Sequence, residues 1–140
     1  MATYFGTSIN DSATIVLQAG SGIENTQGIA LAIEDGALVK PAKGANVIGI
    51  ALLTNDENVE KDDDVTVQIK DIGKWVAGGA IVVGDELTTD ADGKAIPAVS
   101  GDFITAVALS KATEAGTVVK VQIIKAGYKS AVTVSEEGGN

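Results

Sequence analysis

The sequence predicts a mainly β domain with little or no helix, and three observations support this prediction. The 140 residues include 17 glycines but only 4% aromatic residues, a composition typical of a turn-rich scaffold. No segment completes three helical turns before it meets a glycine or a run of alternating β-branched residues. The strand pattern of residues 47–69 recurs in shortened form at residues 103–123, so we expect two related hairpins.

Each of these hairpins consists of an apolar strand, a loop and a strand of alternating polarity. Ala51-Leu52 in the first copy matches Ala108-Leu109 in the second. The sequence VTVQI at residues 65–69 matches VKVQI at residues 119–123. The loop between the strands is shorter in the second copy, a change that surface loops tolerate. The two hairpins are therefore expected to form the core of the domain.

Composition and charge exclude several classes of partner. The chain has the length of one domain, with 45% hydrophobic and 21% charged residues. Its formal charge of −9 comes with ten lysines and no arginine, so phosphate backbones would be repelled and nucleic acid is not expected as a partner. The sequence has no cysteine and no stretch long enough to span a membrane. Because the N-terminus lacks the features of a secretory signal, we expect synthesis in a cytoplasm.

Residues 1–14 are expected to form an extended N-terminal arm, followed by a β domain at residues 15–129 and a C-terminal tail at residues 130–140. The arm mixes aromatic and small polar residues without a helical period. A disordered start is an alternative interpretation of the same pattern.

The first half of the β domain is predicted to contain three short strands ahead of the first related hairpin, at residues 15–17, 29–33 and 37–39. Asp35-Gly36 supplies the positive φ that a tight hairpin turn needs, and Pro41 ends the third strand. Residues 54–64 are mostly acidic with one lysine, which predicts a solvated loop.

The second half is predicted to contain strands at residues 80–83, 86–89 and 94–96, separated by Gly-Asp and Asp-Gly turns. Pro97 ends the last of these strands. Residues 125–129 parallel residues 70–74, and residues 131–134 offer a final edge strand.

Trp75, the only tryptophan, has two interpretations. A large ring at this position can close one end of a barrel that lacks other aromatic residues. Alternatively, Trp75 and Tyr128 could form an exposed platform on which a ligand stacks. We favour the core position.

The sequence predicts no metal site and no catalytic site. Residues 90–94 (DADGK) begin like a calcium loop, but the fifth ligand, the central glycine and the terminal acid of that motif are all missing. We interpret residues 90–93 as a hairpin turn and residues 62–64 as the tip of a solvated loop. Without histidine or cysteine the usual general base and thiol nucleophile are missing, and the acids are not gathered in an aromatic cleft as a glycosidase requires.

Six motifs follow one another through the predicted core: GIAL at residues 49–52, VTVQI at 65–69, GGAIVVGDEL at 78–87, DGKAI at 92–96, VAL at 107–109 and VKVQI at 119–123. In this order they resemble the capsid cement, or head decoration, proteins of tailed phages. The resemblance covers roughly residues 33–124.

This resemblance implies a small single-domain β-barrel or β-tulip without enzymatic activity or cofactor, commonly a homotrimer. Such a protein binds the outer surface of an expanded phage head and braces neighbouring major capsid subunits. It would be made in the cytoplasm of the host bacterium and carried on the virion. An extended arm can add a strand to a capsid edge, so we predict that Tyr4, Phe5 and Ile9 form a capsid-binding arm.

A second class of function is a ligand-binding β-module of the carbohydrate-binding or surface-layer type. In that case Trp75 and Tyr128 would be exposed and would stack on the ligand. The burial of Trp75 discriminates between the two classes.

Overall fold

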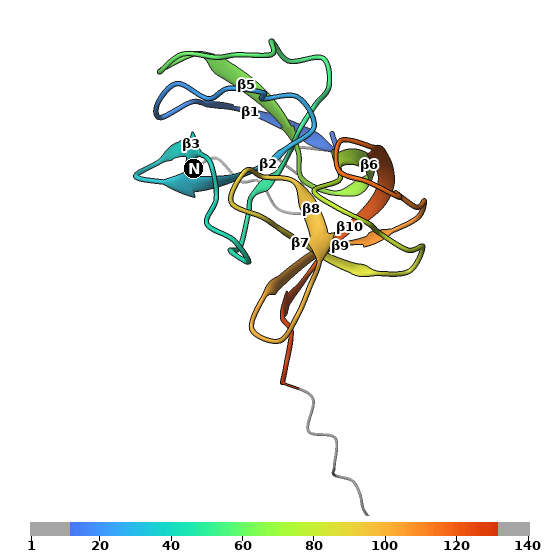
Figure 1. The fold of residues 1–140 in the computed structure, drawn as a ribbon. Helices are drawn as coiled ribbons and strands as arrows, with labels where there is room; N and C mark the ends of the chain where they lie inside the picture. Colours follow the sequence, from blue (N-terminus) through green and yellow to red (C-terminus); the bar gives the residue numbers. More distant parts are fainter. Residues whose placement is uncertain (1–11, 132–140) are drawn as a thin grey trace, which may run out of the picture.

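The computed structural model describes residues 12–131, which fold into two five-stranded antiparallel sheets (Figure 1). These residues contain no helix, and therefore no helix that could cross a membrane. The predicted mainly β fold is confirmed. Of the predicted final edge strand at residues 131–134, all but the first residue lies outside the described range.

The first sheet has the strand order β1-β5-β4-β2-β3. Its strands are β1 (Thr14–Gln18), β2 (Ala30–Glu34), β3 (Ala37–Val39), β4 (Gly49–Ala51) and β5 (Asp64–Gln68). The second sheet has the order β6-β10-β9-β7-β8. Its strands are β6 (Asp71–Val76), β7 (Glu86–Thr89), β8 (Ala95–Pro97), β9 (Phe103–Ala108) and β10 (Val118–Tyr128).

The two sheets have one topology, because adding five to each strand number of the first order gives the second. The register repeats as well: Ala51 pairs with Val67 across β4 and β5, and Ala108 pairs with Val121 across β9 and β10. The two hairpins predicted from sequence are thus confirmed. They are the most similar parts of a larger repeat, which we call the first unit (β1–β5) and the second unit (β6–β10).

Backbone hydrogen bonds outside the strands also recur between the units. The amide of Gly28 donates to the carbonyl of Ala51 at 2.9 Å, and that of Gly84 donates to Ala108 at 2.8 Å. Both glycines have positive φ, at 74° and 95°. The left-handed conformation is one that glycine adopts readily, so the chain reverses at the same point in each unit. The paired strands of the two units can therefore be compared residue by residue, whereas the loops between them differ in length.

The strand pairings leave both sheets open among the described residues, so the predicted barrel or tulip is not confirmed. In the first unit a single parallel bridge, Ala19 to Leu38, links the segment after β1 to the edge strand β3. In the second unit the bridge from Ala77 to Ala95 does the same. A single bridge in each unit is not a pairing of two strands, so it does not close the sheet.

Two clusters of buried apolar side chains form the core, one within each unit. The cluster of the second unit also includes Ala30, Val47 and Ile50 from the first unit, so the units share buried surface. Trp75 lies in this shared cluster with no exposed surface, and its Nε1 donates to the carbonyl oxygen of Gly93 at 2.7 Å. The core position predicted for Trp75 is confirmed, and the alternative of an exposed platform at this residue is wrong.

The predicted turns at Asp35-Gly36 and at residues 90–93 are both present. Asp35 and Gly36 have φ of 53° and 81°, as a tight turn between β2 and β3 requires. The Asp90 Oδ1 atom accepts hydrogen bonds from the amides of Asp92 and Lys94 at 2.9 and 2.8 Å. This carboxylate therefore closes its own turn.

The strand predicted at residues 80–83 is wrong. Only Ile81 makes a bridge, while Val82 and Val83 are 67% and 59% exposed. Residues 82–85 form a turn instead. The amide of Val82 donates to Asp85 Oδ2 at 2.9 Å, and the amide of Asp85 donates to the Val82 carbonyl at 3.0 Å. This apolar run is thus a loop with a buried Ile81 and two exposed valines, and not a strand.

Candidate docking surface

Each unit ends in a tip where two connecting loops meet. The first tip consists of residues 19–28, between β1 and β2, and residues 52–63, between β4 and β5. The second tip consists of residues 77–84, between β6 and β7, and residues 109–117, between β9 and β10. The tips lie apart, with the first at the top of Figure 1 and the second at its right-hand side.

One pair of reciprocal backbone hydrogen bonds joins the two loops of each tip. Ile23 and Val59 exchange bonds of 2.9 and 3.0 Å in the first tip. Ile81 and Ala112 exchange bonds of 2.9 and 3.0 Å in the second. All four side chains are buried. The two tips therefore share a backbone frame, and the side chains beyond this frame can be compared directly.

The first tip is acidic and polar. It carries six exposed acids and one lysine: Glu24, Asp56, Glu57, Glu60, Asp62, Asp63 and Lys61. Hydrogen bonds tie its polar groups together, from Gln27 Nε2 to the Asn55 carbonyl at 2.7 Å and from the Thr26 amide to the Glu57 carbonyl at 2.7 Å. This surface is suited to contact with water.

The second tip is apolar and carries no net charge. Its only charged residues are Lys111 and Glu114. Between Ile81 and Gly84 it presents Val82 and Val83, where the first tip presents Glu24 to Gln27 between Ile23 and Gly28. A hollow of about 450 Å³ lies beside these valines; its lining is Ala80, Ile81, Val82, Val83, Lys111, Ala112 and Thr113.

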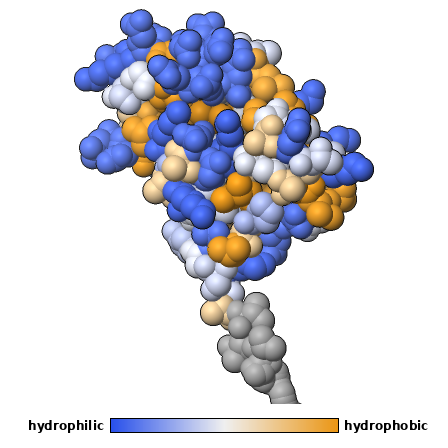
Figure 2. Space-filling model, viewed as in Figure 1, coloured by the Kyte–Doolittle hydropathy of each residue, from blue (hydrophilic) through white to orange (hydrophobic). Residues whose placement is uncertain are grey.

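Figure 2 shows this contrast on one face of the molecule. Hydrophilic atoms cover the top, over the first tip, whereas hydrophobic atoms gather at the right, over the connection between β6 and β7. Because monomeric proteins rarely expose clustered apolar side chains without a role, the second tip is the strongest candidate for a protein-docking surface.

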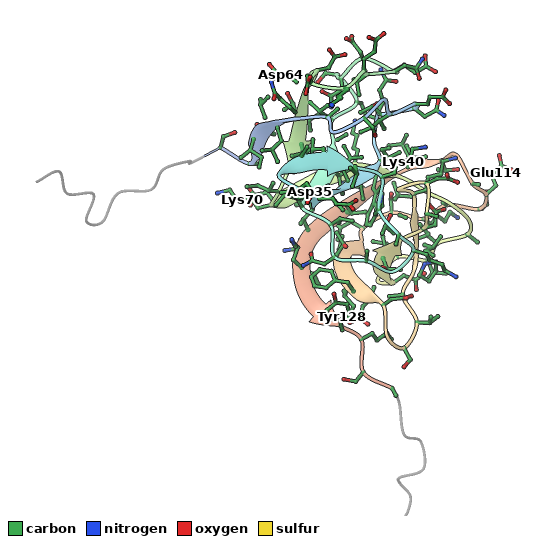
Figure 3. The ribbon with its side chains drawn as sticks, turned by 90° about the vertical axis from the view of Figure 1, so that its left-hand side faces the viewer. Asp35, Lys40, Asp64, Lys70, Glu114 and Tyr128 are labelled. Carbon is green, nitrogen blue, oxygen red and sulfur yellow. The ribbon has the colours of Figure 1, made fainter. Side chains whose placement is uncertain are left out.

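A smaller aromatic surface lies at the far end of β10. Tyr128, which is 65% exposed, meets the Phe103 ring edge-on at 5.2 Å between centroids. The Nζ atom of Lys125 lies 5.7 Å from the centroid of the same Phe103 ring. Burial lowers the pKa of Lys125, because removal from water disfavours the charged ammonium. Tyr128 labels this end of the molecule in Figure 3, well separated from Glu114 of the second tip.

A third apolar surface lies between the units. Leu52, Leu53 and Ile72 contribute to a groove of about 290 Å³. Gln68 stabilises the connection between β5 and β6 beside this groove, since its Nε2 donates to the carbonyls of Lys70 and Ile72, both at 2.9 Å. The groove is thus part of the connection between the units.

Within residues 12–131, no three His, Cys, Asp or Glu side chains gather into a group that could hold a metal ion. The three residues predicted to form a capsid-binding arm, Tyr4, Phe5 and Ile9, lie outside the described residues. Their role stays a prediction.

The sequence interpretation missed the second tip because it assigned Val82 and Val83 to a strand at residues 80–83. A signal was present in the spacing of glycines. Gly28 precedes β2, and Gly84 precedes β7. These two strands pair with β4 and β9, which are the first strands of the two related hairpins. Extending the hairpin repeat backward to these glycines would have aligned Val82-Val83 with a polar loop.

Comparison with known proteins identifies the family. The sequence profile of the phage cement protein family matches residues 7–123, which is more than half of the chain. The chain therefore belongs to the phage cement protein family. It is a capsid-associated structural protein of a bacteriophage.

A solved structure shows the same fold. The crystal structure of the head fiber gp8.5 N base in bacteriophage phi29 matches with a TM-score of 0.61, over 83% of this chain and 97% of that chain. The two sequences are 23% identical, so this likeness establishes a common fold and nothing about binding. No curated protein matches the chain.

Proposed function

We propose that this protein coats the outer surface of an expanded phage head and stabilises the head by bridging neighbouring major capsid subunits. The observation that carries the proposal is the match of the cement family across residues 7–123. The described surface supports a binding role, because Val82, which is 67% exposed, is held in a turn by hydrogen bonds of its backbone with Asp85. The role is structural and not enzymatic.

The charge distribution fits such a coat protein. A net charge of −9 keeps copies soluble before they attach, in the cytoplasm of the host bacterium, and disfavours contact with DNA. Many copies on one head would make weak individual contacts sufficient, since each bridge is reinforced by its neighbours.

Two further features belong to the proposal. The protein acts as a homotrimer, so that one trimer can contact several capsid subunits. The arm with Tyr4, Phe5 and Ile9 reaches a neighbouring capsid subunit, because a segment of about ten residues spans on the order of 30 Å when extended. A strand edge on the capsid is the kind of partner that an extended segment can join.

A ligand-binding module has less support, because Trp75 is fully buried and cannot stack on a sugar. Tyr128 alone would leave a platform of one exposed aromatic ring.

The experiment uses heads of the parent phage assembled without this protein, in expanded and unexpanded forms. We expect the purified full-length protein to sediment with expanded heads and to raise the temperature at which they rupture. Failure to sediment with expanded heads would contradict the proposed function. Equal binding to unexpanded heads would contradict the part that concerns expansion.

A further inference from the structure

From the contrast between the two tips, we infer that the second tip is the surface that docks on the major capsid protein. The inference rests on the proposed function and adds the location and chemistry of the contact. The partner is an uncharged, apolar patch on the outer face of the capsid subunit.

The repeat supplies the first argument. The two tips have the same frame, with reciprocal bonds at Ile23 and Val59 in one and at Ile81 and Ala112 in the other. This fold therefore does not require apolar residues at a tip, as the polar first tip demonstrates. Val82 and Val83 are exposed although polar residues fit the equivalent loop, which points to a partner that covers them.

The second argument is that the apolar surface is preformed. The Val82 amide is held by Asp85 Oδ2, and the Gly84 amide is held by the Ala108 carbonyl. Both valines are thus presented on an ordered turn, so docking loses little conformational freedom. The adjacent hollow of about 450 Å³ gives an apolar projection from the capsid a place to enter.

The family match argues for the capsid over a second copy of this chain, because a phage cement protein is associated with the capsid. Six acids and one lysine give the first tip a formal charge of −5, whereas the second tip carries one lysine and one glutamate. The second tip can therefore approach an uncharged apolar surface without the cost of removing a cluster of acids from water. Lys111 lines the hollow beside the valines as a charged group next to an apolar centre, an arrangement common in protein interfaces.

The test measures binding of full-length variants to expanded heads that lack this protein. The main variant combines Val82→Glu with Val83→Gln, which gives the second tip side chains of the kind found in the first. A second variant, Val82→Ser with Val83→Ser, removes the apolar surface without adding charge. The control is Val99→Glu, because Val99 is 61% exposed on the separate loop between β8 and β9.

We expect both tip variants to raise the apparent Kd for heads by roughly tenfold or more, while the control binds as the wild type does. Circular dichroism spectra and masses in solution should stay unchanged, since the replaced side chains are exposed.

Three results would overturn the inference. Wild-type binding by both tip variants would show that the capsid contact lies elsewhere. A change in oligomer mass caused by the tip variants would make the second tip an interface between copies. Equal loss of binding by Val99→Glu would show a general effect of charge. If wild-type protein fails to bind heads at all, the proposed function itself is wrong, a result distinct from these three.

Discussion

The backbones of Ile81 and Ala112 exchange two hydrogen bonds, of 2.9 and 3.0 Å, and so hold together the loops that present Val82 and Val83. Ile23 and Val59 make the same pair of bonds in the first unit, beneath an acidic surface. A duplicated frame thus carries two chemically different surfaces. This division allows one unit to bind while the other stays solvated.

The first prediction concerns the shared core. Replacing Trp75 with Ala should lower the free energy of unfolding by about 3–5 kcal/mol, because it removes a fully buried ring and the hydrogen bond to Gly93. Chemical denaturation followed by circular dichroism measures this loss. Tyr128→Ala is the control, since Tyr128 is largely exposed, and it should cost much less. Similar losses for both variants would contradict the core assignment.

The second prediction concerns Gly49 in β4. A Cβ atom at Gly49 would meet the backbone carbonyl oxygen of Gln68 far inside van der Waals contact. We expect Gly49→Ala to destabilise the protein by about 1–3 kcal/mol, because the β4–β5 pairing must shift. Gly79→Ala is the matched control, since a Cβ there meets nothing within 4 Å. Thermal melts of the two variants test this prediction. A Gly49→Ala variant as stable as the wild type would contradict it.

The third prediction concerns pH and Lys125. Burial lowers the pKa of Lys125 from 10.5 in the folded protein, so the unfolded chain binds more protons between the lowered pKa and 10.5. Within that window the free energy of unfolding should gain a contribution that rises with pH. In Lys125→Met this contribution is missing, so the stability difference from wild type should change in favour of wild type as the pH approaches 10.5. Denaturant melts across this range would show a constant difference if Lys125 were fully hydrated.

The fourth prediction concerns the N-terminal arm. Deleting residues 1–11 should greatly weaken binding to expanded heads, because Tyr4, Phe5 and Ile9 are proposed to contact the capsid. The truncated protein should keep its β spectrum and its cooperative melt, since every named strand lies after this segment. Sedimentation with heads and circular dichroism test the two parts separately. A truncated protein that still binds normally would remove the arm from the proposed interface.

Much of the fold was predictable because local chemistry determines it. Asp35-Gly36 specified a tight turn, and the alternation in VTVQI and VKVQI specified paired strands in the same register. The full repeat was missed because only its hairpins retain similar sequence, while the rest retains hydrogen bonds such as those of Gly28 and Gly84.

The docking surface was not predictable in the same way. A short run of apolar residues is compatible with a buried strand and with an exposed loop, and periodicity cannot separate them. At Val82 and Val83 the outcome depends on the Asp85 side chain and on pairing across 30 residues of chain, between Ile81 and Ala112. Such non-local contacts become visible only in three dimensions.

An electron cryomicroscopy map of expanded heads decorated with this protein would show directly which tip docks on the capsid. We expect density for the chain on the outside of the head, with residues 77–84 and 109–117 against the major capsid protein and the acidic residues 54–64 free of contact. A map in which the acidic loop contacts the capsid while Val82 and Val83 face solvent would rule out docking through the second tip.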